Sequence, residues 1–211
     1  MEQGNERNDF LKIIAIVAMI FDHGGQIFFP HSLIFRIIGR IALPIFAYGI
    51  AEGVRHTADI KKYFFRLLFL GTITQVPYGL LFETTTLNIL FTLAVAVAAL
   101  YFLQKKNYFL FLAVLVFSYF APIDYSIYGV LLPVVFYQFR ENNVTIIIFS
   151  SALFLLNSMN MIVSNFHILG VLLLLYWPKD LIKVRLLKYF FYYFYFVHIV
   201  ILFALKILFK I

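Results

Sequence analysis

The chain has 211 residues, of which 64% are hydrophobic and only 13% are charged. This composition excludes an ordinary soluble domain and predicts a membrane protein, with the lipid bilayer as its first partner. The absence of cysteine excludes disulfides, thiolate metal sites and cysteine nucleophiles. The net charge of +7 does not indicate a nucleic acid partner, because the positions of the basic residues explain it better.

Apolar stretches of spanning length follow one another along almost the whole chain. We expect a single domain over residues 1–211, an all-α polytopic transmembrane bundle of about nine spans, with eight to ten as the range. Mixed charges before residue 10 and the lack of a small-residue cleavage site indicate that the first span is retained. Spans five to seven are short and can be tilted differently or only partly inserted. The spans are expected at 10–29, 33–53, 63–82, 87–104, 107–121, 126–139, 144–158, 161–177 and 188–210.

Basic residues occur in alternate connections between these spans. They gather after spans two, four, six and eight, and the intervening connections contain none: Arg55, Lys61, Lys62, Lys105, Lys106, Arg140, Lys179, Lys183 and Arg185. By the positive-inside rule this alternation places the N-terminus in the cytoplasm and, with nine spans, the C-terminus outside. The protein is therefore expected to be a multi-pass component of the cytoplasmic membrane.

Ionisable residues also lie deep inside the first two spans. Such residues are costly in a bilayer, so they usually face a protein interior or a water-filled cavity. In an antiparallel hairpin, residues at equal depth have a nearly constant sum of residue numbers. This register predicts that Asp22 faces Arg40 and that Lys12 faces Glu52. Both pairs are compatible with a structural role as well as with a functional one. Pro44, in the second span, predicts a bend there.

Several runs in this region resemble the TraX family of bacterial membrane proteins. The specific ones are LKIIAI at 11–16, FDHGG at 21–25, RIIGRIALPIFAY at 36–48 and AEGVRHT at 51–57. Weaker similarity extends through QVPY at 75–78, NILFTL at 88–93 and YGVLL at 128–132. Leu43 departs from the pattern, where an aromatic residue is expected. The best-known members of the family acetylate the N-terminus of conjugative pilin. The family is related to the acyltransferase type 3 membrane enzymes, in which a basic residue, ten spacers and a histidine recur, as Lys12 and His23 do here.

The predicted topology separates the polar residues into two sets. The outer set is expected to line a cavity that opens to the exterior: Asp22, His23, Arg36, Arg40, Gln75, Asn88, Thr92, Asn165 and His167, with Asp124 and Tyr125 at its rim. The inner set is net basic and suits phosphate groups: Lys12, Glu52, Arg55, Lys61, Lys62 and Arg66. For Lys61 and Lys62, the positive-inside bias explains the charge equally well.

The resemblance implies an acetyltransferase that uses acetyl-CoA as donor, and the two sets suggest roles for individual residues. His23 is the expected general base, with Arg40 or Arg36 stabilising the oxyanion or holding Asp22. Lys12 and His23 are eleven residues apart, about 16 Å along a helix, which is on the scale of the pantetheine arm. The donor is expected at Lys12, Glu52, Arg55 and His56, and the acceptor beside Gln75, Asn88, His167 and His198. His167 is equally interpreted as a satisfied buried polar residue.

Two other classes of function remain open. A small-solute transporter would also need buried charges and bent helices, and a structural membrane subunit would use the charge pairs only for cohesion. No metal site is expected, since no His-Glu-x-x-His or similar spacing occurs. The acceptor, an amine or hydroxyl of a protein, peptide or surface glycan, stays open, as does a covalent acetyl-histidine intermediate.

Overall fold

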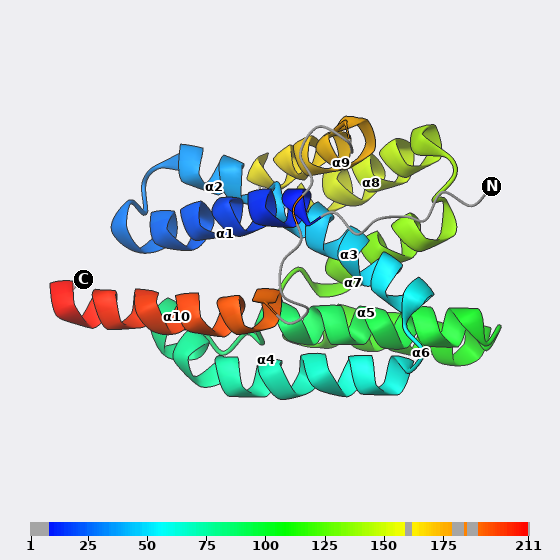
Figure 1. Cartoon of the computed structure of the whole chain (residues 1–211), viewed down its shortest axis with the longest axis horizontal. Coiled ribbons are helices and arrows are strands. Elements are labelled where there is room, and N and C mark those ends of the chain that lie inside the picture. The colour runs from blue at the N-terminus through cyan, green and yellow to red at the C-terminus, as the bar shows by residue number, and fades with distance from the viewer. Residues whose placement is uncertain (1–8, 159–161, 179–183, 185–189, 211) are drawn as a thin grey trace.

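The computed structural model describes residues 9–158, 162–178, 184 and 190–210, and these residues form helices with no strand (Figure 1). The predicted all-α class is confirmed. Lys179, Lys183 and Arg185, which contribute to the predicted orientation, lie outside the described residues, as do the first residues of the last two predicted spans. The helices are α1 (Phe10–Phe28), α2 (Leu33–Gly39), α3 (Ala42–His56), α4 (Ile60–Phe82), α5 (Ile89–Gln104), α6 (Tyr108–Phe120), α7 (Ser126–Gln138), α8 (Asn143–Ser158), the 3-10 helix η1 (Ile162–Phe166), α9 (His167–Tyr176) and α10 (Phe190–Phe209).

Four stretches of the described chain are long and apolar enough to cross a membrane. They are Phe10–Phe28, Leu33–His56, Ile60–Phe82 and Phe190–Phe209. The remaining α-helices are apolar but shorter, as expected for spans five to seven, with α6 and α7 only 13 residues long. Because about 20 residues are needed to cross the hydrocarbon core at right angles, length does not establish that each short helix spans it. The nine-span topology and the orientation of the N-terminus therefore stay predictions.

Polar side chains at the helix ends explain where several helices begin. Asp59 accepts a hydrogen bond from the backbone N–H of Lys62 at the start of α4, and Asn88 accepts one from Leu90 at the start of α5. Asn107 does the same at the start of α6. Short oxygen-bearing side chains favour such positions because they satisfy backbone donors that lack an intrahelical partner.

The second predicted span is not one continuous helix. The chain turns at Arg40 and Ile41, so that α2 and α3 are separate helices. Pro44 stands four residues after Arg40 and has no backbone N–H to donate to the carbonyl of Arg40, which accounts for a break at this point. The break allows α2 to pack on α1 while α3 packs against α5, α7 and α9.

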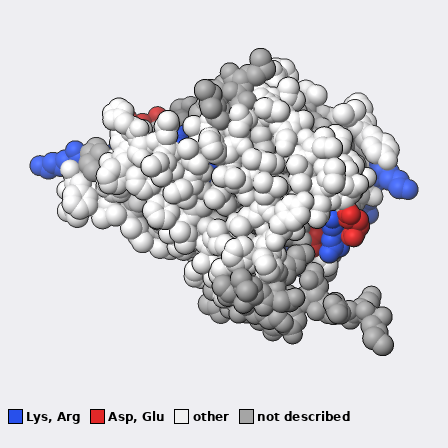
Figure 2. Space-filling view, turned by 90° about the horizontal axis from the view of Figure 1, so that it is seen from above, with Lys and Arg blue, Asp and Glu red and all other residues white. Residues whose placement is uncertain are grey.

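Small side chains form much of the core at the centre of the bundle. Ala47 and Ala51 of α3, and Ala94, Ala96 and Ala99 of α5, are completely buried. Small residues let membrane helices approach closely and gain van der Waals contact. Large apolar side chains are exposed on the outer faces instead, mainly on α4, α6, α8 and α10. The space-filling view accordingly shows a broad uncharged face, with charged side chains toward its edges (Figure 2). This distribution is that of a membrane protein.

The connections divide between two ends of the molecule. The turns after α3, α5 and α7 lie at one end, and those after α1 and α4 lie at the other (Figure 1). The described basic residues of the predicted connections lie in or beside the first group of turns, and the second group contains no Lys or Arg. The connections with and without basic residues thus lie at opposite ends, as the charge pattern predicts. The connection 121–125 is different. It lies well inside the ends of α1 and α10, because α6 and α7 are short (Figure 1).

Candidate functional site

A cavity of about 470 Å³ lies where the α1–α2 hairpin meets α3, α4, α10 and the connection 121–125. This volume falls in the range of small-molecule sites, about 300–1,000 Å³. Its lining combines aromatic rings with ionisable groups, and the polar members are Asp22, His23, Gln26, Arg36, Arg40, Tyr78, Thr84, Thr86, Asp124, Tyr125, Ser126 and Tyr195. The predicted polar cavity is therefore present, and it contains Asp22, His23, Arg36 and Arg40 from the predicted outer set.

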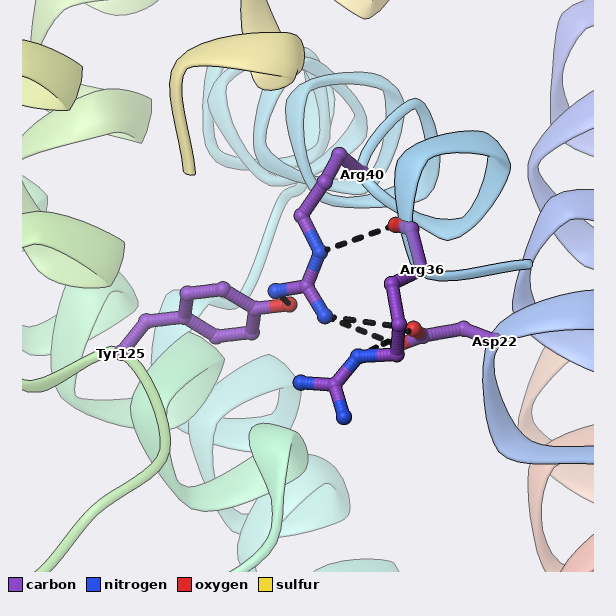
Figure 3. Close-up of polar contacts among 4 residues, drawn as sticks. All are labelled: Asp22, Arg36, Arg40 and Tyr125. Atoms are coloured by element: carbon purple, nitrogen blue, oxygen red, sulfur yellow. Dashed lines mark hydrogen bonds and ion pairs between the residues drawn. The ribbon is translucent and has the colours of Figure 1, made fainter. Parts of the chain in front are cut away.

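An ion-pair network centred on Asp22 forms one wall of the cavity (Figure 3). Arg40 donates from Nη2 to both carboxylate oxygens of Asp22, at 3.2 and 3.3 Å. It also donates from Nη1 to the hydroxyl of Tyr125 at 3.0 Å and from Nε to the carbonyl of Arg36 at 3.2 Å. The predicted pairing of Asp22 with Arg40 is confirmed, and Arg40 is held on three sides.

Arg36 is held less tightly than Arg40. Its Nε lies 3.5 Å from Asp22 Oδ1, and its side chain is 29% exposed, against 8% for Arg40. In Figure 3 the two terminal nitrogen atoms of Arg36 point away from the carboxylate. Arg36 therefore presents to the cavity guanidinium N–H groups that are not bonded to Asp22. The N–H groups of Arg40, in contrast, are engaged within the network.

Gly39 permits the close approach of α1 and α2 at this network. A Cβ atom at Gly39 would collide with the side chain of Asp22, and a Cβ atom at Gly25 would collide with Phe35. The carboxylate therefore lies directly against the backbone of α2. The geometry explains why glycine is required at Gly39 for the ion pair to form.

Two histidines meet beside this network. His23, on α1, lines the cavity and is half-buried, and its Nδ1 lies 2.8 Å from Nε2 of His198 on α10. His198 is buried and is not part of the cavity lining. We expect His198 near an acceptor from sequence, but the structure places it behind His23. The sequence contains no signal for this pair, since 175 residues separate the two.

The connection 121–125 forms the wall opposite α1, and backbone contacts hold it in place. The N–H of Asp124 donates to the carbonyl of Leu87 at 2.9 Å, and the hydroxyl of Thr92 donates to the carbonyl of Asp124 at 2.6 Å. Tyr125 adopts a left-handed backbone conformation with φ of 59°. Asp124 and Tyr125, expected at the rim, are part of the cavity lining, because α6 and α7 are short.

Besides His198, the three other residues expected beside an acceptor lie outside the cavity lining. Gln75 Oε1 accepts hydrogen bonds from the backbone and side-chain nitrogens of Asn88, both at 2.9 Å, and its Nε2 donates to the carbonyl of Thr86. These bonds stabilise the turn between α4 and α5. His167 is buried between the rings of Phe154 and Tyr125, with centroid distances of 5.0 and 5.5 Å. Gln75, Asn88 and His167 thus support the cavity walls and do not face its interior.

The predicted pair of Lys12 and Glu52 is wrong. Lys12 instead forms an ion pair with Asp9 at 2.8 Å and lies over the ring of Phe191. Glu52 lies near the nitrogen atoms of Arg55, His56 and Arg140, at 3.4, 3.4 and 3.7 Å. The break between α2 and α3 carries Glu52 away from α1, so the hairpin register does not extend that far.

The inner residues therefore do not form one group: Lys62 pairs with Asp59, and Arg66 lies over the rings of Tyr63 and Tyr192. In the Glu52 cluster, which consists of Glu52, Arg55, His56 and Arg140, two arginines share one partly buried carboxylate, and Arg140 also lies 3.9 Å from the exposed carboxylate of Glu141. Arg55 also packs on the ring of Tyr137, 4.4 Å from its centroid, and donates to the carbonyl of Tyr137. Such a cluster fits an anionic group better than a metal ion. Lys12, which pairs with Asp9, is not part of the Glu52 cluster.

Comparison with known proteins finds relatives that match part of the chain and one family that matches most of it. The chain is 38% identical over 106 residues to a protein named "Probable fimbrial assembly protein FimC, serogroup H1" of Dichelobacter nodosus, a match that covers 43% of each chain. It is 33% identical over 99 residues to "Uncharacterized protein RP591" of Rickettsia prowazekii (strain Madrid E), covering 46% of this chain and 38% of the relative. The chain thus matches less than half the length of these curated relatives. No solved structure matches it significantly.

The family comparison covers almost the whole chain. The family described as "TraX protein" matches residues 7–206, which include every residue that lines the cavity and the predicted motif residues of the first two spans. This match assigns the family, although each individual relative matches less than half of the chain. The chain belongs to the TraX protein family.

Proposed function

We propose that this protein is a membrane-embedded acyltransferase that moves an acetyl group from cytoplasmic acetyl-CoA to an amine or hydroxyl at the outer face. The observation that carries the proposal is the convergence of His23, Arg36 and the Asp22–Arg40 pair on one cavity. Acyl transfer needs a base for the acceptor proton and a cation for the developing oxyanion, and both kinds of group face the same space.

His23, Arg36 and Arg40 have different roles in the proposed reaction. The acceptor atom bonds to the thioester carbonyl carbon while His23 takes its proton. The carbon–sulfur bond then breaks, and the departing thiolate recovers that proton from His23. Arg36, whose terminal nitrogens point away from Asp22, supplies donors to the oxyanion (Figure 3). Arg40 is engaged with Asp22 and Tyr125 and acts by holding the carboxylate and the cavity wall in place.

The donor phosphates are assigned to the Glu52 cluster rather than to Lys12. Arg55 and Arg140 share the carboxylate of Glu52. The second carboxylate near Arg140, that of Glu141, is exposed and 3.9 Å away, whereas Lys12 is held by the buried Asp9 at 2.8 Å. Arg55→Gln should therefore raise the KM for acetyl-CoA more than it lowers kcat, because this contact is shared by the ground state and the transition state. Lys12→Gln is the matched comparison and should raise the KM less. A larger effect at Lys12 would contradict the assignment.

The acceptor is assigned to a class only. The Dichelobacter relative carries a name from fimbrial assembly, which favours a pilin-like or other surface protein as acceptor over a free small molecule. The two other classes make different predictions. A transporter moves a solute without consuming acetyl-CoA, and a structural subunit does neither.

The test uses the full chain in oriented proteoliposomes with labelled acetyl-CoA on the cytoplasmic side and candidate acceptors on the other. Label should transfer only with donor and acceptor on these sides, and His23→Ala should abolish transfer while the protein still inserts. A folded His23→Ala variant with normal turnover would remove His23 as the base. If acetyl-CoA neither binds nor is consumed, the acyltransferase assignment itself is refuted.

A further inference from the structure

The geometry of the contact between His23 and His198 indicates which nitrogen of His23 carries a proton. The ring planes of His23 and His198 differ by only 11°, and their centroids lie 5.0 Å apart. This separation exceeds the 2.8 Å between the two nitrogen atoms by about the width of one imidazole ring. The rings are therefore nearly coplanar and meet edge to edge, so that each nitrogen points at the other within the ring plane, as a linear hydrogen bond requires.

A backbone carbonyl decides the direction of this hydrogen bond. Nδ1 of His198 lies 3.3 Å from the carbonyl oxygen of Phe194, one turn earlier on α10. A carbonyl oxygen can only accept, so His198 Nδ1 carries the proton and donates. In a neutral ring the other nitrogen, Nε2, then has only a lone pair, and His23 Nδ1 must donate to it.

This hydrogen bond determines the protonation state of the other nitrogen of His23, Nε2. Once Nδ1 of His23 carries the proton, Nε2 of the neutral ring has the free lone pair. Among the described residues Nε2 makes no hydrogen bond of its own, and the ring lines the cavity. A general base must present an unprotonated nitrogen to its substrate, and the orientation of the imidazole usually depends on a partner at the other nitrogen.

We propose that His198 is a positioning residue, which fixes the Nδ1–H tautomer of His23 and thereby leaves Nε2 free to accept a proton in the cavity. The same contact serves the imidazolium that forms when Nε2 takes the proton, because His198 still accepts from Nδ1. The ring of His198 is itself held by stacking on Phe194, with planes 7° apart. The catalytic part of this inference rests on the proposed function, but the tautomer does not.

The test combines histidine-selective ¹⁵N NMR with kinetics on the full chain in micelles. The chain has five histidines, and the His23 signals can be assigned by their loss in His23→Gln. In the wild type, His23 should show a protonated Nδ1 and an unprotonated Nε2. His198→Leu should mix or reverse this state and lower kcat at least about 100-fold, since a general base contributes about 10²–10⁴. The KM for acetyl-CoA should change little.

His198→Gln separates positioning from packing. Its side-chain carbonyl oxygen can replace Nε2 as acceptor, so it should keep the His23 tautomer and restore most of kcat relative to His198→Leu. Thr74→Val is a matched control for loss of a buried polar group, because Thr74 lies on α4, bonds only to the Leu70 carbonyl among the described residues, and does not line the cavity.

Three results would overturn the inference. They are an Nε2–H tautomer of His23 in the wild type, a His198→Leu variant no more impaired than Thr74→Val, and a His198→Gln variant as impaired as His198→Leu. If the wild type transfers no acetyl group, the proposed function fails on its own. The tautomers of the wild type and of the two His198 variants still decide whether His198 controls His23.

Discussion

Breaking the ion pair between Asp22 and Arg40 should show whether this network stabilises the bundle. At the 3.2 Å separation of the pair, two unit charges attract by about 5 kcal/mol for an effective dielectric constant of about 20. The side chains are only 8% and 10% exposed, so solvent screens them little. Removing one partner from such a pair costs about 3–5 kcal/mol, because the other charge is left buried.

The two single substitutions should not cost the same. Arg40→Met leaves Asp22 with Arg36 at 3.5 Å, so its cost should lie near 3 kcal/mol, the lower end of the range. Asp22→Asn leaves two guanidinium groups without their carboxylate, and its cost should lie near the upper end. The double variant should be less destabilised than the sum of the two by about 2–3 kcal/mol, the coupling expected of residues in direct contact.

The assay is equilibrium unfolding in mixed detergent micelles, followed by circular dichroism and by fluorescence of Trp177. This residue is the single tryptophan of the chain and stacks on Phe10 at 5.3 Å. Arg36→Met is the control and should cost less than Arg40→Met, since its side chain is 29% exposed. If the losses of the two single variants add up in the double variant within about 0.5 kcal/mol, Asp22 and Arg40 do not interact and the reasoning fails.

Two further predictions concern packing and pH. Gly39→Ala should lower the free energy of unfolding by about 1–3 kcal/mol, because its Cβ meets Asp22. Gly24→Ala, with nothing within 4 Å, should be neutral or stabilising, and equal losses in the same titration would contradict this. Lys206 donates to Glu83 at 2.7 Å and, by this bond and its charge, holds the pKa of that carboxyl below its usual 4.5. The stabilisation is therefore present above the unfolded pKa and is lost as pH falls through the folded one. Hydrogen exchange at the end of α10, corrected for intrinsic rates, should rise at low pH in the wild type, and Glu83→Gln should show raised exchange already at pH 7. A wild type that exchanges alike at both pH values would refute this.

The pairing of Asp22 with Arg40 could be predicted because Asp22 lies on α1 and Arg40 immediately follows α2, the next and antiparallel helix. Over that short distance, helix geometry relates residue number to depth. The same rule fails for Lys12 and Glu52, because the chain turns at Arg40 and Ile41 and α3 takes a different path from α2. Pro44 indicates a bend in the sequence, but its direction depends on which helices α3 packs against.

Composition and spacing alone are sufficient to predict a helical membrane protein, the existence of most of its helices and a polar cavity around Asp22 and Arg40. They suffice because the bilayer demands satisfied backbone groups and apolar surfaces, and these demands act on each stretch of chain separately. The partnership of His23 with His198, the inward position of Tyr125 and the place of Arg55 with Arg140 depend on packing between distant helices. Such contacts follow from the fit of side chains across α1, α7 and α10, and no local pattern in the sequence encodes that fit.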